Sequence, residues 1–307
     1  MATAFNDAAH DGLLRAQREL GIEFSYVEPQ SADDFLPFLR TMAESGNYDL
    51  IVSVGLLQNE ALTEVSRSFP NQRFTHLDSN LDLPNVSGQQ TRWQDQTFLA
   101  GVMAGFGTLS DEMPLRNEES NTIGVILGLD LPDLRPGIVG FEAGARLVNP
   151  DVTVLVDFVG DFGNPTAGRE VALNMFEQGA DFVLAIAGAS STGVFTAARE
   201  EGRYAFAAGG VVNSVEPNHI VATAHRSIGS MLFNDIRALV EGDWQGGFNI
   251  SGLAQGSVSF ETQGSNVQIP SQIGVDIERA RLMVIIGELT PPGTAEELEE
   301  WLANNSL

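Results

Sequence analysis

Apolar runs of strand length alternate with amphipathic segments in the middle of the chain. Residues 153–160, 181–188 and 203–210 are apolar along most of their length, which predicts strands covered by helices on both faces. The two segments between them carry apolar residues at helical spacing, and Gly179 and Gly202 end these predicted helices. The pattern predicts a βαβαβ unit with a parallel sheet and right-handed connections.

The same alternation covers the rest of the chain and predicts two lobes. The predicted helices span residues 5–20, 35–42, 60–69, 94–106, 137–147, 228–242, 276–287 and 296–303. The predicted strands span residues 24–27, 50–54, 74–78, 122–128 and 219–223, and residues 249–260 are strand-like. The polar residues 107–121 are interpreted as the first crossover between lobes. We therefore predict an α/β fold with one lobe formed by residues 1–118 and 226–252 and a second formed by residues 119–225 and 253–307, each a parallel sheet flanked by helices.

Small residues follow several predicted strands, at Gly55, Asn164, Gly188 and Gly209. Parallel sheets of this kind bind ligands where strands end and helices begin, and helix N-termini there offer N–H groups. Two interpretations remain open for these positions. They let a ligand approach the backbone, or they only turn the chain.

A set of short motifs recurs in a fixed order along the chain. They are Phe5-Asn6 with Gly12, Phe98 to Gly101, Phe162 with Pro165 and Gly168, Glu177 to Asp181, Ala187-Gly188, Gly193 to Phe195, and Ala197-Ala198. With these motifs the chain resembles the basic-membrane-protein family of solute-binding proteins, which includes purine-nucleoside receptors of ABC importers. The resemblance spans nearly the whole chain.

The resemblance implies a two-lobed, periplasmic-binding-protein-like fold of type I that closes on a small molecule between its lobes. It implies a nucleoside-like ligand, ABC permease subunits as partners, and an extracytoplasmic location at the cell surface through a lipid anchor. It implies neither a catalytic activity nor a cofactor.

The resemblance also suggests roles for single residues. Phe5 and Phe162 match aromatic residues that sandwich the base, and Asp78 matches a carboxylate that binds it. Asn6 offers a donor and an acceptor to a heterocycle. For each residue a structural role stays open: core packing for Phe5, a helix cap for Asn6, and a loop cap for Asp78.

Two positions depart from the family pattern. Gly209 stands where the family has an Asp that binds the ribose hydroxyls. Arg226 corresponds best to a family lysine, and a salt bridge with a surface acid is the alternative role for its guanidinium. The sugar half of the site is therefore the part that the resemblance leaves undefined.

The charge of the chain is strongly negative. Among 307 residues there are 41 Asp and Glu against 16 basic residues, which are all arginine, and the formal net charge is −25. Such a chain is poorly suited to bind nucleic acid or an anionic membrane through electrostatic attraction. The lysine-free, acidic composition is typical of proteins adapted to high salt, and ordinary acidic solubility is the alternative.

No constellation of residues typical of catalysis stands out in the sequence. There is no cysteine, and His10, His76, His219 and His225 show no metal-binding spacing. The absence of lysine excludes a P-loop lysine and a Schiff base. A ligand-sensing regulator domain of the same architecture is the first alternative function, and a nucleoside-processing enzyme is the second.

The family begins with an apolar strand before the motif at Phe5-Asn6, whereas only four residues precede that motif here. That strand is expected to lie at the centre of its sheet, between residues 24–27 and 50–54. We therefore expect an upstream segment that supplies a signal, an anchor and the first strand. No apolar run in the sequence has the length of a membrane span.

Overall fold

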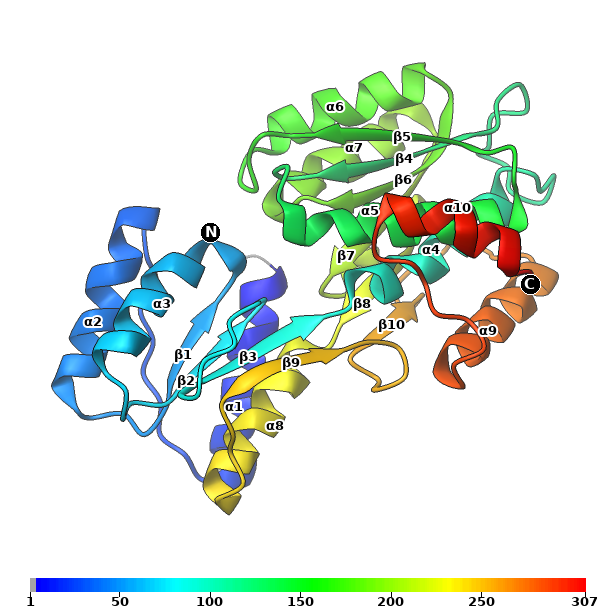
Figure 1. The fold of residues 1–307 in the computed structure, drawn as a ribbon. Helices are drawn as coiled ribbons and strands as arrows, with labels where there is room; N and C mark the ends of the chain where they lie inside the picture. Colours follow the sequence, from blue (N-terminus) through cyan, green and yellow to red (C-terminus); the bar gives the residue numbers. More distant parts are fainter. Residues whose placement is uncertain (1–3) are drawn as a thin grey trace. The chain divides into compact units, whose positions relative to one another are not determined.

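The computed structural model describes residues 4–307, with side chains from Asn6 onward, and divides the chain into two compact units. The N-terminal unit consists of Asn6–Thr91 and Ser227–Ser251. The C-terminal unit contains Arg92–Arg226 and Gly252–Leu307. Each is a sheet flanked by helices, so the predicted α/β class is confirmed (Figure 1).

The N-terminal unit is built on a four-stranded parallel sheet with strand order β1-β2-β3-β9. The strands are β1 (Ile51–Val54), β2 (Phe74–Leu77), β3 (Val86–Thr91) and β9 (Gly247–Ser251). The helices are α1 (Ala4–Leu20), α2 (Phe35–Ser45), α3 (Asn59–Ser68) and α8 (Ile228–Glu241). Buried apolar side chains of α2, α3 and the sheet form the core of this unit. They include Leu39, Leu62, Val65, Phe74 and Val86.

The C-terminal unit is built on a six-stranded sheet with strand order β10-β8-β7-β6-β4-β5, in which only β10 is antiparallel. The strands are β4 (Thr122–Leu127), β5 (Thr153–Phe158), β6 (Ala180–Ile186), β7 (Tyr204–Gly209), β8 (Ile220–Arg226) and β10 (Val258–Glu261). The helices are α4 (Trp93–Gly107), α5 (Arg135–Val148), α6 (Pro165–Glu177), α7 (Ser191–Glu201), α9 (Ser271–Ile285) and α10 (Ala295–Asn304). Every residue of β6 is buried, as expected for a central strand covered on both faces.

Helix α4 belongs to the C-terminal unit because it packs on α5 through backbone contact. A Cβ atom at Gly101 would lie 2.0 Å from the carbonyl oxygen of Phe141, and one at Gly144 would lie 2.1 Å from that of Phe98. The predicted division at residue 118 therefore differs from the division at Thr91 and Arg92 in the structure. The two later divisions, after Arg226 and after Ser251, lie within one residue of the predicted ones.

Two strand predictions need correction, and one strand was not predicted. Residues 24–27 form no strand, and Tyr26 and Val27 are exposed, so their apolar character reflects no burial in a sheet. The strand-like residues 249–260 form two strands, β9 and β10, in different units. Strand β3 was missed because its sequence, Val-Ser-Gly-Gln-Gln-Thr, is mostly polar although it is largely buried.

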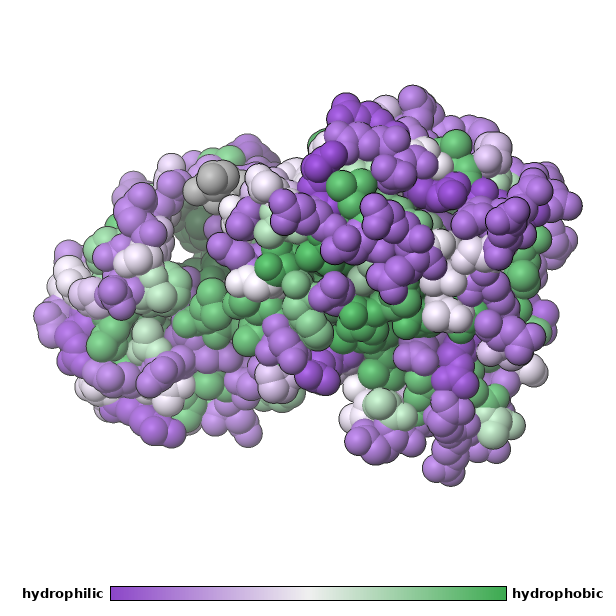
Figure 2. Space-filling model, turned by 90° about the horizontal axis from the view of Figure 1, so that it is seen from above, coloured by the Kyte–Doolittle hydropathy of each residue, from purple (hydrophilic) through white to green (hydrophobic). Residues whose placement is uncertain are grey.

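The exposed surface reflects the acidic composition. On the face drawn in Figure 2, hydrophilic residues cover most of the surface of the chain. The arginines that pair with acids include Arg15 with Glu19, Arg40 with Glu64 and Arg146 with Glu299. Since acids outnumber arginines 41 to 16, arginine pairing neutralises only part of the acidic charge.

We predict that Gly101→Ala lowers the free energy of unfolding of the C-terminal unit by about 1–3 kcal/mol, because the added methyl group would overlap the Phe141 carbonyl. Gly274→Ala is the matched control, since Gly274 lies in α9 with no atom within 4 Å of an added Cβ. It should raise the free energy of unfolding by about 0.5–1 kcal/mol. Equal effects of the two substitutions in denaturant titrations would contradict the close packing of α4 on α5.

Candidate functional site

The candidate residues of the C-terminal unit lie at the carboxyl ends of its parallel strands. Phe162 and Asn164 follow β5, Gly188 follows β6, and Gly209 and Arg226 end β7 and β8. The register of the sheet brings these strand ends to one edge. This is the edge at which open parallel sheets bind ligands.

Phe162 is held in place by two glycines of neighbouring strand ends. Its ring is so close to Gly128, which follows β4, that a Cβ there would lie 2.2 Å from the ring. Gly188 adopts φ +58°, and a Cβ there would lie 3.1 Å from the Phe162 carbonyl oxygen. The ring is half-buried, so part of it remains accessible. The two glycines therefore leave the space that Phe162 occupies. The sequence did not indicate this role for Gly128.

Ser190 fixes the loop that carries Phe162. Its backbone N–H donates to the Phe162 carbonyl at 3.0 Å, and its hydroxyl donates to the Asp161 carbonyl at 2.8 Å. The same hydroxyl accepts the N–H of Asn164 at 2.8 Å. The buried serine therefore ties the loop after β5 to the loop after β6.

Asn164 is the N-cap of α6. Its side-chain oxygen accepts the N–H of Ala167 at 3.1 Å, and Pro165 occupies the first helical position. The side-chain oxygen therefore has a structural partner, while the residue remains exposed beside Phe162.

Gly209 ends β7 with φ +112°, a conformation that favours glycine over residues with a Cβ. A Cβ at this position would meet no atom within 4 Å, so the space beside the strand end is open. An aspartate could fill that space, but it would be strained in this backbone conformation.

Arg226 is buried, with 5% of its surface exposed, and its guanidinium carbon lies 4.2 Å from the centre of the Trp93 indole. This geometry is a cation–π contact, which a planar guanidinium makes well. The Arg226 side chain is therefore held inside the C-terminal unit rather than on its surface. The indole of Trp93 is a partner that sequence spacing did not indicate.

The candidate residues of the N-terminal unit also follow strands. Gly55 follows β1 with φ +100°, and its N–H donates to the Leu77 carbonyl at the end of β2 at 2.9 Å. Asp78 comes directly after β2, is 7% exposed, and has φ +60°. It is the one residue other than glycine with positive φ among residues 4–307 that the structure describes. Such a conformation is sparsely populated for a residue with a Cβ and is often found at functional sites.

The two remaining candidates lie in α1. The side chain of Phe5 lies outside the described residues. Asn6 is exposed and lies within α1, which begins at Ala4, so the interpretation of Asn6 as the helix cap is wrong.

His76 lies in β2, two residues before Asp78, and is fully buried. Its Nε2 atom is 2.8 Å from Oδ1 of Asn59. The Nδ2 atom of Asn59 in turn donates a hydrogen bond to Oδ1 of Asn80 at 3.2 Å. Burial lowers the pKa of His76 to about 4, although a backbone hydrogen bond at Ser53 and the charge of Asp78 oppose this shift. The neutral imidazole therefore orients polar groups beside the strand end without adding positive charge.

Within the described part of the chain, no group of three or more His, Asp or Glu side chains could hold a metal ion. In that same part, no helix combines the length and apolar character needed to cross a membrane.

The two α/β units, each with candidate residues at its strand ends, define a fold of the type I periplasmic-binding-protein-like class. A solved solute-binding protein of an ABC transporter system from Aeropyrum pernix K1 has this fold, with a TM-score of 0.84, 24% identity, and coverage of 98% of this chain and 93% of that one. Residues 3–289 match the family model described as "ABC transporter substrate-binding protein PnrA-like", and the chain belongs to this family.

Two sequence relatives show how far the similarity extends. An uncharacterized lipoprotein of Pyrococcus horikoshii is 32% identical over 269 residues, which cover 84% of this chain and 65% of the relative. Basic membrane protein A1 of Borrelia garinii subsp. bavariensis is 26% identical over 97% of this chain and 87% of its own length. The resemblance to the basic-membrane-protein family is therefore confirmed.

The low pKa of His76 predicts a pH dependence of stability. Because the pKa of histidine is 6.5 in the unfolded chain and about 4 in the folded protein, unfolding takes up a proton between these pH values. His76 should therefore cost the N-terminal unit about 3 kcal/mol of stability as the pH falls from 6.5 to 4.

Denaturant titrations of the wild type and of His76→Gln at several pH values check this prediction. The difference between the two proteins isolates the histidine from the titrating carboxylates. The wild type should lose more stability than His76→Gln on acidification, and parallel pH profiles would show that the imidazole titrates normally.

Proposed function

We propose that this chain is the solute-binding component of an ABC importer and that it binds a purine nucleoside or a related base with residues of both units. Binding would proceed without turnover of the ligand. ABC permease subunits would be its partners, at an extracytoplasmic position that a lipid anchor maintains. The family to which the chain belongs supports the transport role.

The packing of Phe162 on two glycines is the observation that supports a planar ligand. The ring of Phe162 lies at a strand end, packs closely on Gly128 and Gly188, and is only partly buried, so a planar heterocycle would stack on its accessible part. Because the glycines and the Ser190 hydrogen bonds hold the ring before binding, little side-chain entropy would be lost on stacking.

The polar contacts of the ligand are proposed for the strand ends of both units. Asp78 would accept hydrogen bonds from the base, and Asn6 would bind its edge. Gly55, Gly188 and Asn164 would let the ligand approach the backbone. Gly209 offers open space in place of a carboxylate, and Arg226 would bind the sugar side from its position over Trp93.

Replacing the ring of Phe162 tests the stacking directly. Phe162→Ala should weaken the binding of inosine or adenosine by about 1–3 kcal/mol in isothermal titration calorimetry, because stacking is lost. Phe162→Tyr keeps a ring and is the matched control, with affinity close to that of the wild type. Unchanged affinity of Phe162→Ala, together with a large fall in its melting temperature, would show that the ring is only structural.

The replacement of the family carboxylate by Gly209 predicts a weak preference for the sugar. A charged hydrogen bond is worth about 1.5–3 kcal/mol, so its absence should bring the affinities for adenosine and adenine closer together. Calorimetry with adenosine and adenine, and with inosine and hypoxanthine, measures the ratio. A nucleoside preference of about a thousandfold, near 4 kcal/mol, would show that another residue binds the ribose.

Incubation with these nucleosides, followed by chromatography of the products, separates binding from enzymatic turnover. Recovery of unchanged nucleoside agrees with the proposal, whereas conversion to free base would favour the alternative of a nucleoside-processing enzyme.

A further inference from the structure

After Asn6 the chain passes between the two units three times. The passages fall between Thr91 and Arg92, between Arg226 and Ser227, and between Ser251 and Gly252. In the C-terminal unit, the chain segment next to each of the three passages contacts the first turn of α4. These contacts lie wholly within the C-terminal unit.

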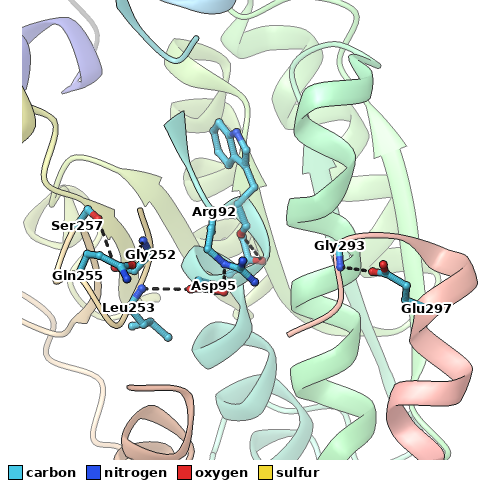
Figure 3. Close-up of polar contacts among 10 residues, drawn as sticks. Arg92, Asp95, Gly252, Leu253, Gln255, Ser257, Gly293 and Glu297 are labelled. Atoms are coloured by element: carbon cyan, nitrogen blue, oxygen red, sulfur yellow. Dashed lines mark hydrogen bonds and ion pairs between the residues drawn. The ribbon is translucent and has the colours of Figure 1, made fainter. Parts of the chain in front are cut away.

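Asp95 in this turn binds the first and the third passage. Its Oδ1 accepts a hydrogen bond from Arg92 Nε at 3.1 Å, and its Oδ2 accepts the backbone N–H of Leu253 at 3.2 Å (Figure 3). The carboxylate is nearly inaccessible, since only 4% of the Asp95 surface is exposed. A buried carboxylate with two donors from different chain segments holds those segments together.

Gly252 is needed for the close approach of the third passage. A Cβ at Gly252 would lie 2.0 Å from Oδ2 of Asp95 and 3.1 Å from Cδ of Arg92. The turn that follows is tied to itself, because Gly252 N–H donates to the Gln255 side chain at 2.8 Å and Ser257 N–H donates to the Gly252 carbonyl at 3.2 Å (Figure 3). The third passage therefore enters the C-terminal unit as a fixed turn.

The second passage is bound by the two neighbours of Asp95 in the same turn. Gln96 Nε2 donates to the Ala224 carbonyl of β8 at 2.8 Å, and both atoms are buried. Trp93 lies under the guanidinium of Arg226, the last residue of the C-terminal unit before this passage. Residues 93, 95 and 96 thus each hold a connecting segment.

From these contacts we propose that the first turn of α4 is the anchor of the hinge between the two units, and that Asp95 is its principal positioning residue. Domain rotation in proteins is absorbed by a few residues at the ends of elements. An anchor on one side confines that rotation to the backbone at residues 91–92, 226–227 and 251–252. The inference does not depend on which ligand the protein binds.

Distance measurements between spin labels test the anchor without any ligand. The chain has no cysteine, so Glu44→Cys in α2 and Glu201→Cys in α7 would place one label on each unit at exposed positions. A second pair, Asp151→Cys with Glu201→Cys, reports on the C-terminal unit alone. Pulsed electron paramagnetic resonance then gives the distribution of distances for each pair.

In the Asp95→Asn variant, the distribution between the units should become broader than in the wild type, while the distribution within the C-terminal unit stays the same. Asparagine keeps the shape of the side chain but replaces one acceptor oxygen with an NH2 donor, so either the hydrogen bond from the Leu253 N–H or the one from Arg92 Nε is lost. Gln96→Met, which removes the bond to Ala224 at similar volume, should broaden the same distribution and serves if Asp95→Asn fails to fold.

Asp181→Asn is the matched control. Asp181 is a fully buried aspartate of the C-terminal unit that accepts hydrogen bonds from Thr108 and from the Asn117 N–H, away from the three passages. It should lower the melting temperature without broadening the distribution between the units. Equal broadening by Asp181→Asn, or no broadening by either anchor variant, would overturn the proposal.

Discussion

The backbone contact between α4 and α5 is the constraint on which the C-terminal unit depends. At Gly101 and Gly144 the backbone of each helix packs against carbonyl groups of the other. A side chain at either position would prevent this close approach. This contact fixes α4 within the C-terminal unit. Its first turn is thereby fixed beside β8 and the Gly252 turn, where Asp95, Gln96 and Trp93 hold three connecting segments. A packing requirement in the core thus determines where the chain is able to bend.

Glycines have a second role at the strand ends. At Gly128 and Gly188 the missing side chain makes room for Phe162, and at Gly209 it leaves open space. The N-terminal unit uses polar groups instead, with a neutral His76 and an Asp78 in a sparsely populated conformation. The strand ends of the two units therefore carry different side chains, with Phe162 and Arg226 in one and His76 and Asp78 in the other.

Much of the fold could be predicted from hydrophobic periodicity, because the central strands β4, β6 and β7 are apolar runs between amphipathic helices. Periodicity missed β3, whose buried residues are mostly polar, and it predicted a strand at residues 24–27 where Tyr26 and Val27 are exposed. The position of α4 could not be predicted, since helical spacing does not reveal which partner a helix packs against. The candidate site was predictable as strand ends carrying small residues. The sequence could not predict the packing of Phe162 on Gly128, the hydrogen bonds of Ser190 or the contact between Trp93 and Arg226. Each of these joins residues that are distant in sequence.

We propose that this member of the family carries a purine compound, unchanged, on residues at its strand ends. Mass spectrometry of the small molecules released when the freshly purified protein is denatured tests it most directly, with the Phe162→Ala variant purified in parallel. We expect a purine nucleoside or base from the wild type and a reduced amount from the variant. Release of a sugar or another compound without a purine ring, in equal amounts from both proteins, would contradict it.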